Sequence, residues 1–346
     1  MHRPLIALVA LGLGSFALSA CNAQFTPYAA RVGNETISQA TLDSALDSIA
    51  SDAGYRCVVE TTSGGSVNVT GAGNGTYNAT FASAALSLLV EAQAVKDRIE
   101  TMHLRVTKFA DEVATNQLPS DFGPPSGSSC TESGAAVFRG LPGRYRNVLL
   151  GLQADEDVLA ARSVGVPLTK AGMSAYMRHH PSSTTLDCAR VIEVASSEKA
   201  TQLANAIRAG VSFAVVAKKN SLDSFSAPKG GSLGCVLPTA LINPLGRILA
   251  ALPVGRLSTP IAFRSDWLLL EVTRRTPDSL LDVATKAVLP QGIQAATADL
   301  ASIVAHAKVS IDPTYGSWAK VRSAFQVRPP SGPPLDLVPN PAAVGG

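Results

Sequence analysis

The spacing of apolar residues changes at Cys188, and this change constrains the possible folds more than any other feature of the chain. Residues 30–182 carry apolar side chains such as Leu42 and Leu46 at helical spacing. From Cys188 to Arg274, short strand-like runs alternate with helical runs and Gly-rich turns in the order βααβαββ. Such an order is typical of a small α+β domain. We therefore predict an α+β fold class, in which a mainly helical domain precedes a small mixed domain.

The individual elements follow from these patterns. In the first part we expect helices over 38–50, 81–98, 107–116, 139–162 and 169–180, separated by polar loops over 61–80 and 119–134. In the second part we expect strands over 189–195, 229–236, 257–262 and 267–274, and helices over 198–209, 213–220 and 243–252. A last helix over 280–308 should be broken or kinked by Pro290 and Gly292.

The N-terminus has the pattern of a secretory signal. A positively charged start precedes an apolar run over 5–18, which suits a signal peptide and is too short for a membrane span of about 20 residues. The run ends in LSAC at 18–21, which resembles a bacterial lipobox. The resemblance implies a signal peptide over 1–20, a lipid on Cys21 and a tether over 21–29. The alternative is a plain secretory signal with a coincidental cysteine, and in both cases the mature chain leaves the cytoplasm.

The charge of the chain excludes a nucleic-acid surface. The chain has 29 Lys and Arg residues and 26 Asp and Glu residues, and no run of basic residues. Only Arg3 among these charges lies in the expected signal peptide, so the mature chain is nearly neutral. Because no second long apolar run follows, the mature protein should be soluble apart from its anchor.

Four cysteines remain in the mature chain besides Cys21: Cys57, Cys130, Cys188 and Cys235. An even number in an oxidising compartment favours two disulfides, for which three pairings exist. We predict Cys57–Cys130 and Cys188–Cys235, because each pair lies within one inferred domain, and each should stabilise its domain by about 2–4 kcal/mol. The second pair flanks strands, which favours a structural disulfide over a reactive thiol. No CxxC pair is present, so no metal site is expected.

Residues 188–276 resemble a parvulin-type peptidyl-prolyl isomerase domain. KGGSLG at 229–234 is similar to the family's KGGDLG turn, and LPVGRLSTP at 252–260 is similar to its L-x-x-G-x-[IL]-S-x-P segment. Between the strand start and these segments, AGVSFA at 209–214 resembles the family's A-G-x-x-F pattern. The three segments occur in the family's order, which makes the resemblance specific.

The helical part is similar to SurA-like chaperone domains. ARVGNETIS at 30–38 resembles their V-N-G-x-x-I-[ST] entry, and LRVT at 104–107 resembles a helix boundary of that family. A strand within 309–318 would then return to the helical domain. The resemblances imply a chaperone domain over 30–182, an isomerase domain over 186–277, and a C-terminal helix and strand over 278–320. We expect the remainder, 321–346, to be a Pro-rich disordered tail.

The family's reaction is the rotation of an X-Pro bond, which has a barrier of about 18–20 kcal/mol. No covalent bond changes, so catalysis means binding the twisted amide more tightly than either planar form. The resemblance implies an apolar proline pocket and, beside it, a polar cluster of two histidines, an Asp or Cys, and hydroxyl groups.

In this chain the polar cluster is largely lost, while the pocket stays apolar. Val191 and Leu268 occupy the two histidine positions. The other matching positions hold Leu241 and Leu245 for the pocket, Asp223 or Ser224 for the acid or thiol, and Phe263 and Ser265 for the hydroxyls. Asp223 has an equally good interpretation as a turn-forming residue. Because both histidines are replaced together, neither position leaves a buried polar group without a hydrogen-bond partner.

The sequence therefore predicts an extracytoplasmic folding factor, anchored to the bacterial membrane through Cys21, that binds unfolded or Pro-containing secreted polypeptides. Its isomerase activity should be weak, and whether it acts as an enzyme stays open. The alternatives are a fully active isomerase with a non-standard site and a non-catalytic structural lipoprotein of the envelope. No cofactor, metal or nucleic acid is expected.

Overall fold

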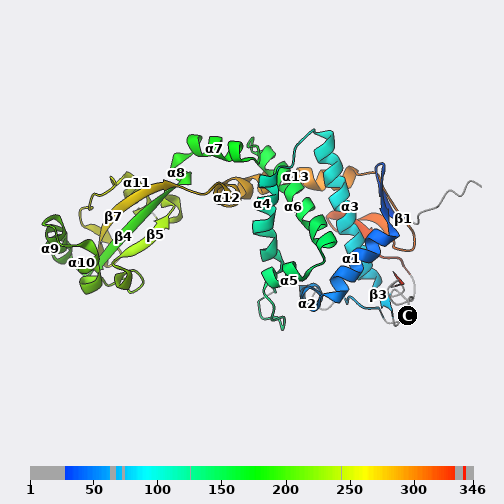
Figure 1. The fold of residues 1–346 in the computed structure, drawn as a ribbon, viewed down its shortest axis with the longest axis horizontal. Helices are drawn as coiled ribbons and strands as arrows, with labels where there is room; N and C mark the ends of the chain where they lie inside the picture. Colours follow the sequence, from blue (N-terminus) through cyan, green and yellow to red (C-terminus); the bar gives the residue numbers. More distant parts are fainter. Residues whose placement is uncertain are drawn as a thin grey trace, which may run out of the picture.

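The computed structural model describes residues 28–62, 68–71, 75–124, 126–242, 244–331 and 338–339. The expected signal peptide, Cys21 and most of the expected tether lie outside these residues. The fold is α+β, as predicted: a helical body with small sheets lies at one end, and a four-stranded antiparallel sheet with its own helices lies at the other (Figure 1). Within the described residues, no helix is both long and apolar enough to span a membrane.

The helical body begins with helices whose N-caps the sequence indicates. Ser38, Asn78, Thr107 and Thr169 each accept a hydrogen bond from a backbone N–H of the helix that follows. The helices are α1 (Gln39–Ser51), α2 (Ala53–Thr62), α3 (Ala79–Thr101), α4 (Lys108–Gln117), η1 (Leu118–Phe122), α5 (Gly134–Gly140), α6 (Gly143–Ser163), α7 (Lys170–His179) and α8 (Pro181–Thr184).

The single helix predicted over 139–162 is wrong. The structure has two helices, α5 and α6, with a break at Leu141 and Pro142. Proline has no N–H to continue the helical ladder, and it disfavours helical backbone at the residue before it. Pro142 therefore indicates a break in the helix, but the helical apolar spacing on both sides of it favoured a single helix.

Short strands close the helical body. β1 (Tyr28–Val32) pairs with β2 (Glu35–Ser38) and with β8 (Val309–Ile311), so a segment near the C-terminus joins the N-terminal hairpin. β3 (Thr76–Tyr77) lies within the stretch predicted as a polar loop and pairs with β11 (Val338–Pro339). Tyr77 is fully buried in the core, which explains why this part of the stretch is a strand.

The prediction that the chain is disordered from residue 321 onward is wrong at its start, because a β-hairpin extends to Arg328. β9 (Ser317–Val321) pairs with β10 (Ala324–Arg328) in an antiparallel hairpin. Val327 is buried, and its N–H donates to the Ser87 hydroxyl of α3 at 2.9 Å. This contact with a helix far away in the sequence fixes the hairpin, and the local composition gives no sign of it.

The last helical stretch consists of α12 (Leu280–Val283), a π-helical turn η4 (Ala284–Val288) and α13 (Leu289–His306). The π-turn precedes Pro290 and accommodates its missing N–H. Gly292 does not break the helix as predicted. A Cβ at Gly292 would lie 2.4 Å from the Ala160 carbonyl oxygen, so the glycine permits close packing of α13 on α6. The Ser163 hydroxyl donates to the Gly292 carbonyl at 3.0 Å.

The second body is one sheet with strand order β5-β4-β7-β6. Its strands are β4 (Thr185–Val194), β5 (Ser232–Val236), β6 (Ile261–Phe263) and β7 (Asp266–Pro277). Helices α9 (Ser197–Arg208) and α10 (Phe213–Asn220) pack on one face through an apolar cluster that includes Ile192 and Leu269. Helix α11 (Leu245–Ala251) packs on the opposite face through a second cluster that includes Val191 and Leu270.

The Gly-rich turn before β5 requires its glycines. Gly230 and Gly231 have φ of 68° and 81°, which L side chains rarely adopt. A Cβ at Gly231 would lie 2.5 Å from the Val191 carbonyl oxygen, and the Gly231 carbonyl in turn accepts from the Val191 N–H at 2.8 Å. The turn thus lies directly against the centre of β4. It follows the short 3-10 helix η2 (Ala227–Lys229) in the chain.

Both disulfides predicted from the sequence are present. Cys57–Cys130 ties α2 to the segment before α5, and Cys188–Cys235 joins directly opposed residues of β4 and β5. The first closes a separation of 73 residues and the second one of 47.

Candidate active site on the four-stranded sheet

Val191 and Leu268, the two positions at which the family resemblance predicts histidine, lie together on the face of the sheet that α11 covers. Val191 on β4 is 6% exposed and Leu268 on β7 is 4% exposed. Both belong to one apolar cluster with Leu249, Leu270 and other side chains of β4, β7 and α11. Apolar side chains of this cluster pack around both residues.

An apolar wall adjoins this cluster. Leu241, Leu245 and Phe263 are partly buried and pack against it from the loop before α11, from α11 and from β6. The Arg264 guanidinium lies 5.2 Å from the centre of the Phe263 ring. The structure therefore brings these three side chains to the same place as Val191 and Leu268.

An ion pair between the buried Asp187 and the more exposed Arg275 fixes helix α11, which carries Leu245. Asp187 on β4 is 1% exposed, and its Oδ1 accepts from Arg275 Nε at 2.8 Å. The Arg275 Nη2 group donates to the carbonyls of Leu249, Ala250 and Leu252, at 3.1, 2.8 and 2.8 Å, at the C-terminal end of α11. A cation at this end also interacts favourably with the helix dipole. Asp187 and Arg275 thus position the apolar wall on the sheet.

The three residual polar candidates are Asp223, Ser224 and Ser265, and the hydrogen bonds described for Asp223 and Ser265 are local. Asp223 accepts hydrogen bonds from the N–H groups of Phe225 and Ser226, at 3.2 and 3.3 Å, and from the Ser226 hydroxyl. Its carboxylate is thereby engaged in a local turn. Ser224 and Ser265 are exposed, and the Ser265 hydroxyl donates to the neighbouring Asp266 at 3.2 Å.

Glu193 is a polar residue of this site that the sequence reasoning missed. It lies directly opposite Leu268 in the β4–β7 register and, two residues from Val191, on the same face. Burial raises the pKa of the Glu193 carboxyl, the nearby Asp266 and Asp223 add to this, and Arg264 opposes it. Its position as a charged residue among the apolar residues of the strand could have indicated a role for Glu193 in the site. It gives the apolar site an acidic edge.

Large apolar side chains are exposed in the loops beside the site. Leu222 and Phe225 flank Asp223 in the chain and are 58% and 65% exposed. Ile242, next to Leu241, is 55% exposed. Contiguous exposed apolar patches are typical of surfaces that contact another polypeptide.

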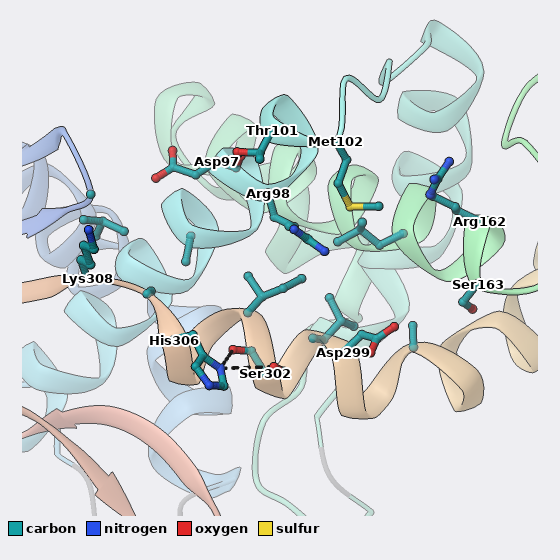
Figure 2. Close-up of a pocket in the computed structure, with 18 residues that line it drawn as sticks. Asp97, Arg98, Thr101, Met102, Arg162, Ser163, Asp299, Ser302, His306 and Lys308 are labelled. Carbon is teal, nitrogen blue, oxygen red and sulfur yellow. Dashed lines mark hydrogen bonds between the residues drawn. The ribbon is translucent and has the colours of Figure 1, made fainter.

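A separate cavity lies in the helical body between α3, α6 and α13 (Figure 2). Its volume is about 580 Å³. Arg98 of α3 and Asp299 of α13 extend toward the space between the helices, with Met102 beside them (Figure 2). Its polar lining combines Asp97, Arg98, Arg162, Asp299, His306 and Lys308 with an apolar floor. Because its walls come from helices far apart in the sequence, no local pattern indicated it.

Comparison with known proteins assigns the four-stranded sheet to a family. Residues 186–274 match the family model of the PPIC-type PPIASE domain, also called rotamase. The chain is 42% identical over 88 residues to the chaperone SurA of Pseudomonas fluorescens (strain Pf0-1), which covers 25% of this chain and 21% of SurA. It is 32% identical over 90 residues to the periplasmic chaperone PpiD of Haemophilus ducreyi, covering 26% of this chain and 14% of PpiD. The matches thus span about a fifth or less of these relatives.

Solved structures also align with the chain, at TM-scores below 0.5. PrsA from Bacillus subtilis aligns with 81% of this chain and 93% of its own, at 17% identity and a TM-score of 0.27. The parvulin domain of PpiD from E. coli aligns with 28% of this chain and 92% of its own, at 21% identity and a TM-score of 0.26.

Proposed function

We propose that this chain, whose residues 186–274 are a PpiC-type parvulin domain, is an extracytoplasmic folding factor that binds unfolded or proline-containing secreted polypeptides and isomerises them weakly. The observation that carries the proposal is the burial of Val191 and Leu268 in one apolar cluster beside an intact apolar wall. Such a site keeps the groups that bind a prolyl ring and lacks the groups that would polarise the amide.

The chemistry of the site favours binding over turnover. An apolar wall removes water from a prolyl ring whether the amide is planar or twisted, so it stabilises ground state and transition state alike. Only interactions that strengthen in the twisted form accelerate rotation. Of the polar groups near the site, the Asp223 carboxylate is already engaged by its own turn.

Two assays on the mature chain carrying Cys21→Ser test this proposal. One measures suppression of aggregation of an unfolded client, and the other measures refolding of a client whose slow step is prolyl isomerisation. We expect suppression at near-equimolar ratios with little acceleration of refolding. Acceleration at ordinary parvulin rates would favour the fully active isomerase, and inactivity in both assays would favour a structural lipoprotein.

The apolar wall should determine peptide binding. Leu241→Asp places a carboxylate where an apolar side chain packs, and burying a charge without a partner is costly. We expect affinity for a Pro-containing unstructured peptide to fall roughly tenfold or more. Asp223→Ala is the matched control, because it removes a carboxylate of the same region, and it should weaken binding less. Fluorescence titration measures both, and equal losses would contradict the assignment of the wall.

The N-terminal pattern leads to a separate prediction about location. We expect Cys21 to carry a lipid, because small residues and a cysteine follow the short apolar run. Since a lipid anchor requires that thiol, Cys21→Ser should move the protein from the membrane fraction to the soluble extracytoplasmic fraction. Fractionation and immunoblotting measure this, with the wild-type chain as the control. Tight membrane association of the variant would contradict the lipid anchor.

A further inference from the structure

We propose that the Cys188–Cys235 disulfide is an exchangeable disulfide that reacts with the thiols of anionic molecules, which gives the chain a thiol–disulfide exchange activity at the edge of its sheet. The site is distinct from the apolar wall and does not depend on isomerisation. Three features support it: Cys235 is exposed, Arg274 lies beside both sulfurs, and the hollow next to them is lined by basic residues.

The two cysteines differ in access. Cys235 lies on β5, which among the described residues is an edge strand of the sheet and pairs with β4. Cys235 is exposed, whereas Cys188 is 8% exposed. An incoming thiolate therefore reaches the Cys235 sulfur, and Cys188 is the leaving group.

Arg274 is placed to stabilise that leaving group. Its Nη2 lies 3.7 Å from the Cys188 sulfur and 4.0 Å from the Cys235 sulfur. A guanidinium beside a cysteine favours the thiolate over the thiol. Because a thiol of lower pKa leaves faster in exchange, Arg274 should accelerate opening of the disulfide.

The hollow beside the disulfide favours an anionic reactant. It has a volume of about 310 Å³ and is lined by both cysteines together with Arg190, Lys229 and Arg274. No Asp or Glu is among the described residues that line it. Glu271 lies opposite Arg190 in the strand register and offsets part of its charge, and Lys229 lies 4.0 Å above the Phe225 ring. The remaining positive charge should attract a thiolate that carries further negative groups.

The reaction is balanced without any other reactant. The incoming thiolate attacks the Cys235 sulfur, the Cys188–Cys235 bond breaks, and Cys188 departs as a thiolate beside Arg274. A second thiolate attacks the incoming sulfur of the mixed disulfide and releases Cys235 as a thiolate. Two external thiols are thereby oxidised to one disulfide, and the protein disulfide is reduced by two electrons.

The other disulfide of the chain is the internal control. The Cys130 sulfur of Cys57–Cys130 lies 3.4 Å from the Thr61 hydroxyl, a neutral group. If access and Arg274 determine reactivity, Cys188–Cys235 should open first in the same molecule under the same conditions. Alkylation of the released thiols and mass spectrometry of the peptides report both pairs at once.

The test uses the mature chain carrying Cys21→Ser and three thiols: anionic 2-mercaptoethanesulfonate, neutral 2-mercaptoethanol and cationic cysteamine. With rates expressed per thiolate, we expect Cys188–Cys235 to open roughly tenfold faster than Cys57–Cys130. The sulfonate should react fastest and cysteamine slowest, and added salt should reduce the difference. No preference between the two disulfides, or no dependence on thiol charge, would overturn the proposal.

Variants separate the role of Arg274 from its contribution to folding. Arg274→Gln should slow opening of Cys188–Cys235 about threefold to tenfold with every thiol, and Arg274→Lys should restore part of the rate. Lys229→Gln should reduce only the preference for the sulfonate. An unchanged rate in Arg274→Gln would contradict the role of the guanidinium. Should that variant fail to fold, the charge series on the unchanged protein still decides the proposal.

Discussion

The mature chain is expected to accelerate prolyl isomerisation about 10²–10⁴-fold less than a parvulin that keeps both histidines, because positioned acid–base and hydrogen-bonding groups typically contribute that much to a rate. Val191 and Leu268, at the positions where the family resemblance places histidines, are buried in one apolar cluster. Desolvation in the apolar site supplies only part of the missing stabilisation.

Refolding of a proline-limited client and two-dimensional NMR exchange of a prolyl peptide measure this rate. A parvulin that retains its histidines, assayed at the same concentration, sets the reference. The double variant Glu193→Gln with Asp223→Asn is the matched control within the chain, since it removes two carboxylates of the acidic edge without changing the size of their side chains. We expect its weak activity to equal that of the wild type. An ordinary parvulin rate would contradict the prediction, and Asp223, Ser224 and Ser265 would then be the residues to vary.

The identity of the sheet could be predicted from sequence because its constraints are local. The glycines of the KGGSLG turn are required by positive φ and by contact with β4, so the motif is tied to one backbone geometry. The assignment of Val191 and Leu268 to the two histidine positions stays a prediction, which rests on the neighbouring residues that match the family.

The features that the sequence could not reveal depend on contacts between distant segments. The β9–β10 hairpin is held by Ser87 of α3, and the cavity of the helical body is formed by α3, α6 and α13. Asp187 and Arg275 meet only because β4 and β7 are paired. Local spacing carries no information on such pairs, whereas it correctly located most helices and strands.

The burial of three consecutive carboxylates on α6 could not be predicted from the sequence either. A helix places Asp155, Glu156 and Asp157 at different angles, and only packing decides which of them is buried. Asp157 is 1% exposed, and its two oxygens accept from Gln153 and Gln117 at 2.9 and 3.1 Å. Burial raises the pKa of Asp157 to about 7, the glutamine hydrogen bonds oppose this, and Asp121 adds to it.

The neighbouring carboxyls shift in the same direction. Burial, followed by the charges of Glu91, Asp157 and Asp155, raises the pKa of Glu156 to about 7. Burial also raises the pKa of Asp155 to about 6, with Lys96 opposing the shift. All three groups therefore bind a proton more tightly in the folded chain than in the unfolded chain, where a carboxyl titrates near pH 4.

The helical body is therefore expected to become more stable as the pH falls. A carboxyl whose pKa is raised by folding contributes full stability below its unfolded pKa and loses it as the pH rises through its folded pKa. Between pH 8 and pH 5, Asp157 alone should raise the free energy of unfolding by about 2–3 kcal/mol. Denaturant titrations of the mature chain carrying Cys21→Ser, followed by far-ultraviolet circular dichroism, measure this difference.

Asp157→Asn isolates the contribution of this carboxyl. The amide keeps the size of the side chain, and a flipped Gln153 can still hydrogen-bond to it, so the variant should fold with little loss at pH 5. At pH 8 it should be more stable than the wild type, because no buried charge has to form. Glu35→Gln, at an exposed carboxylate on β2, is the control and should leave the pH dependence unchanged. A wild-type chain and an Asp157→Asn chain with the same pH dependence would show that this carboxyl does not titrate as its burial requires.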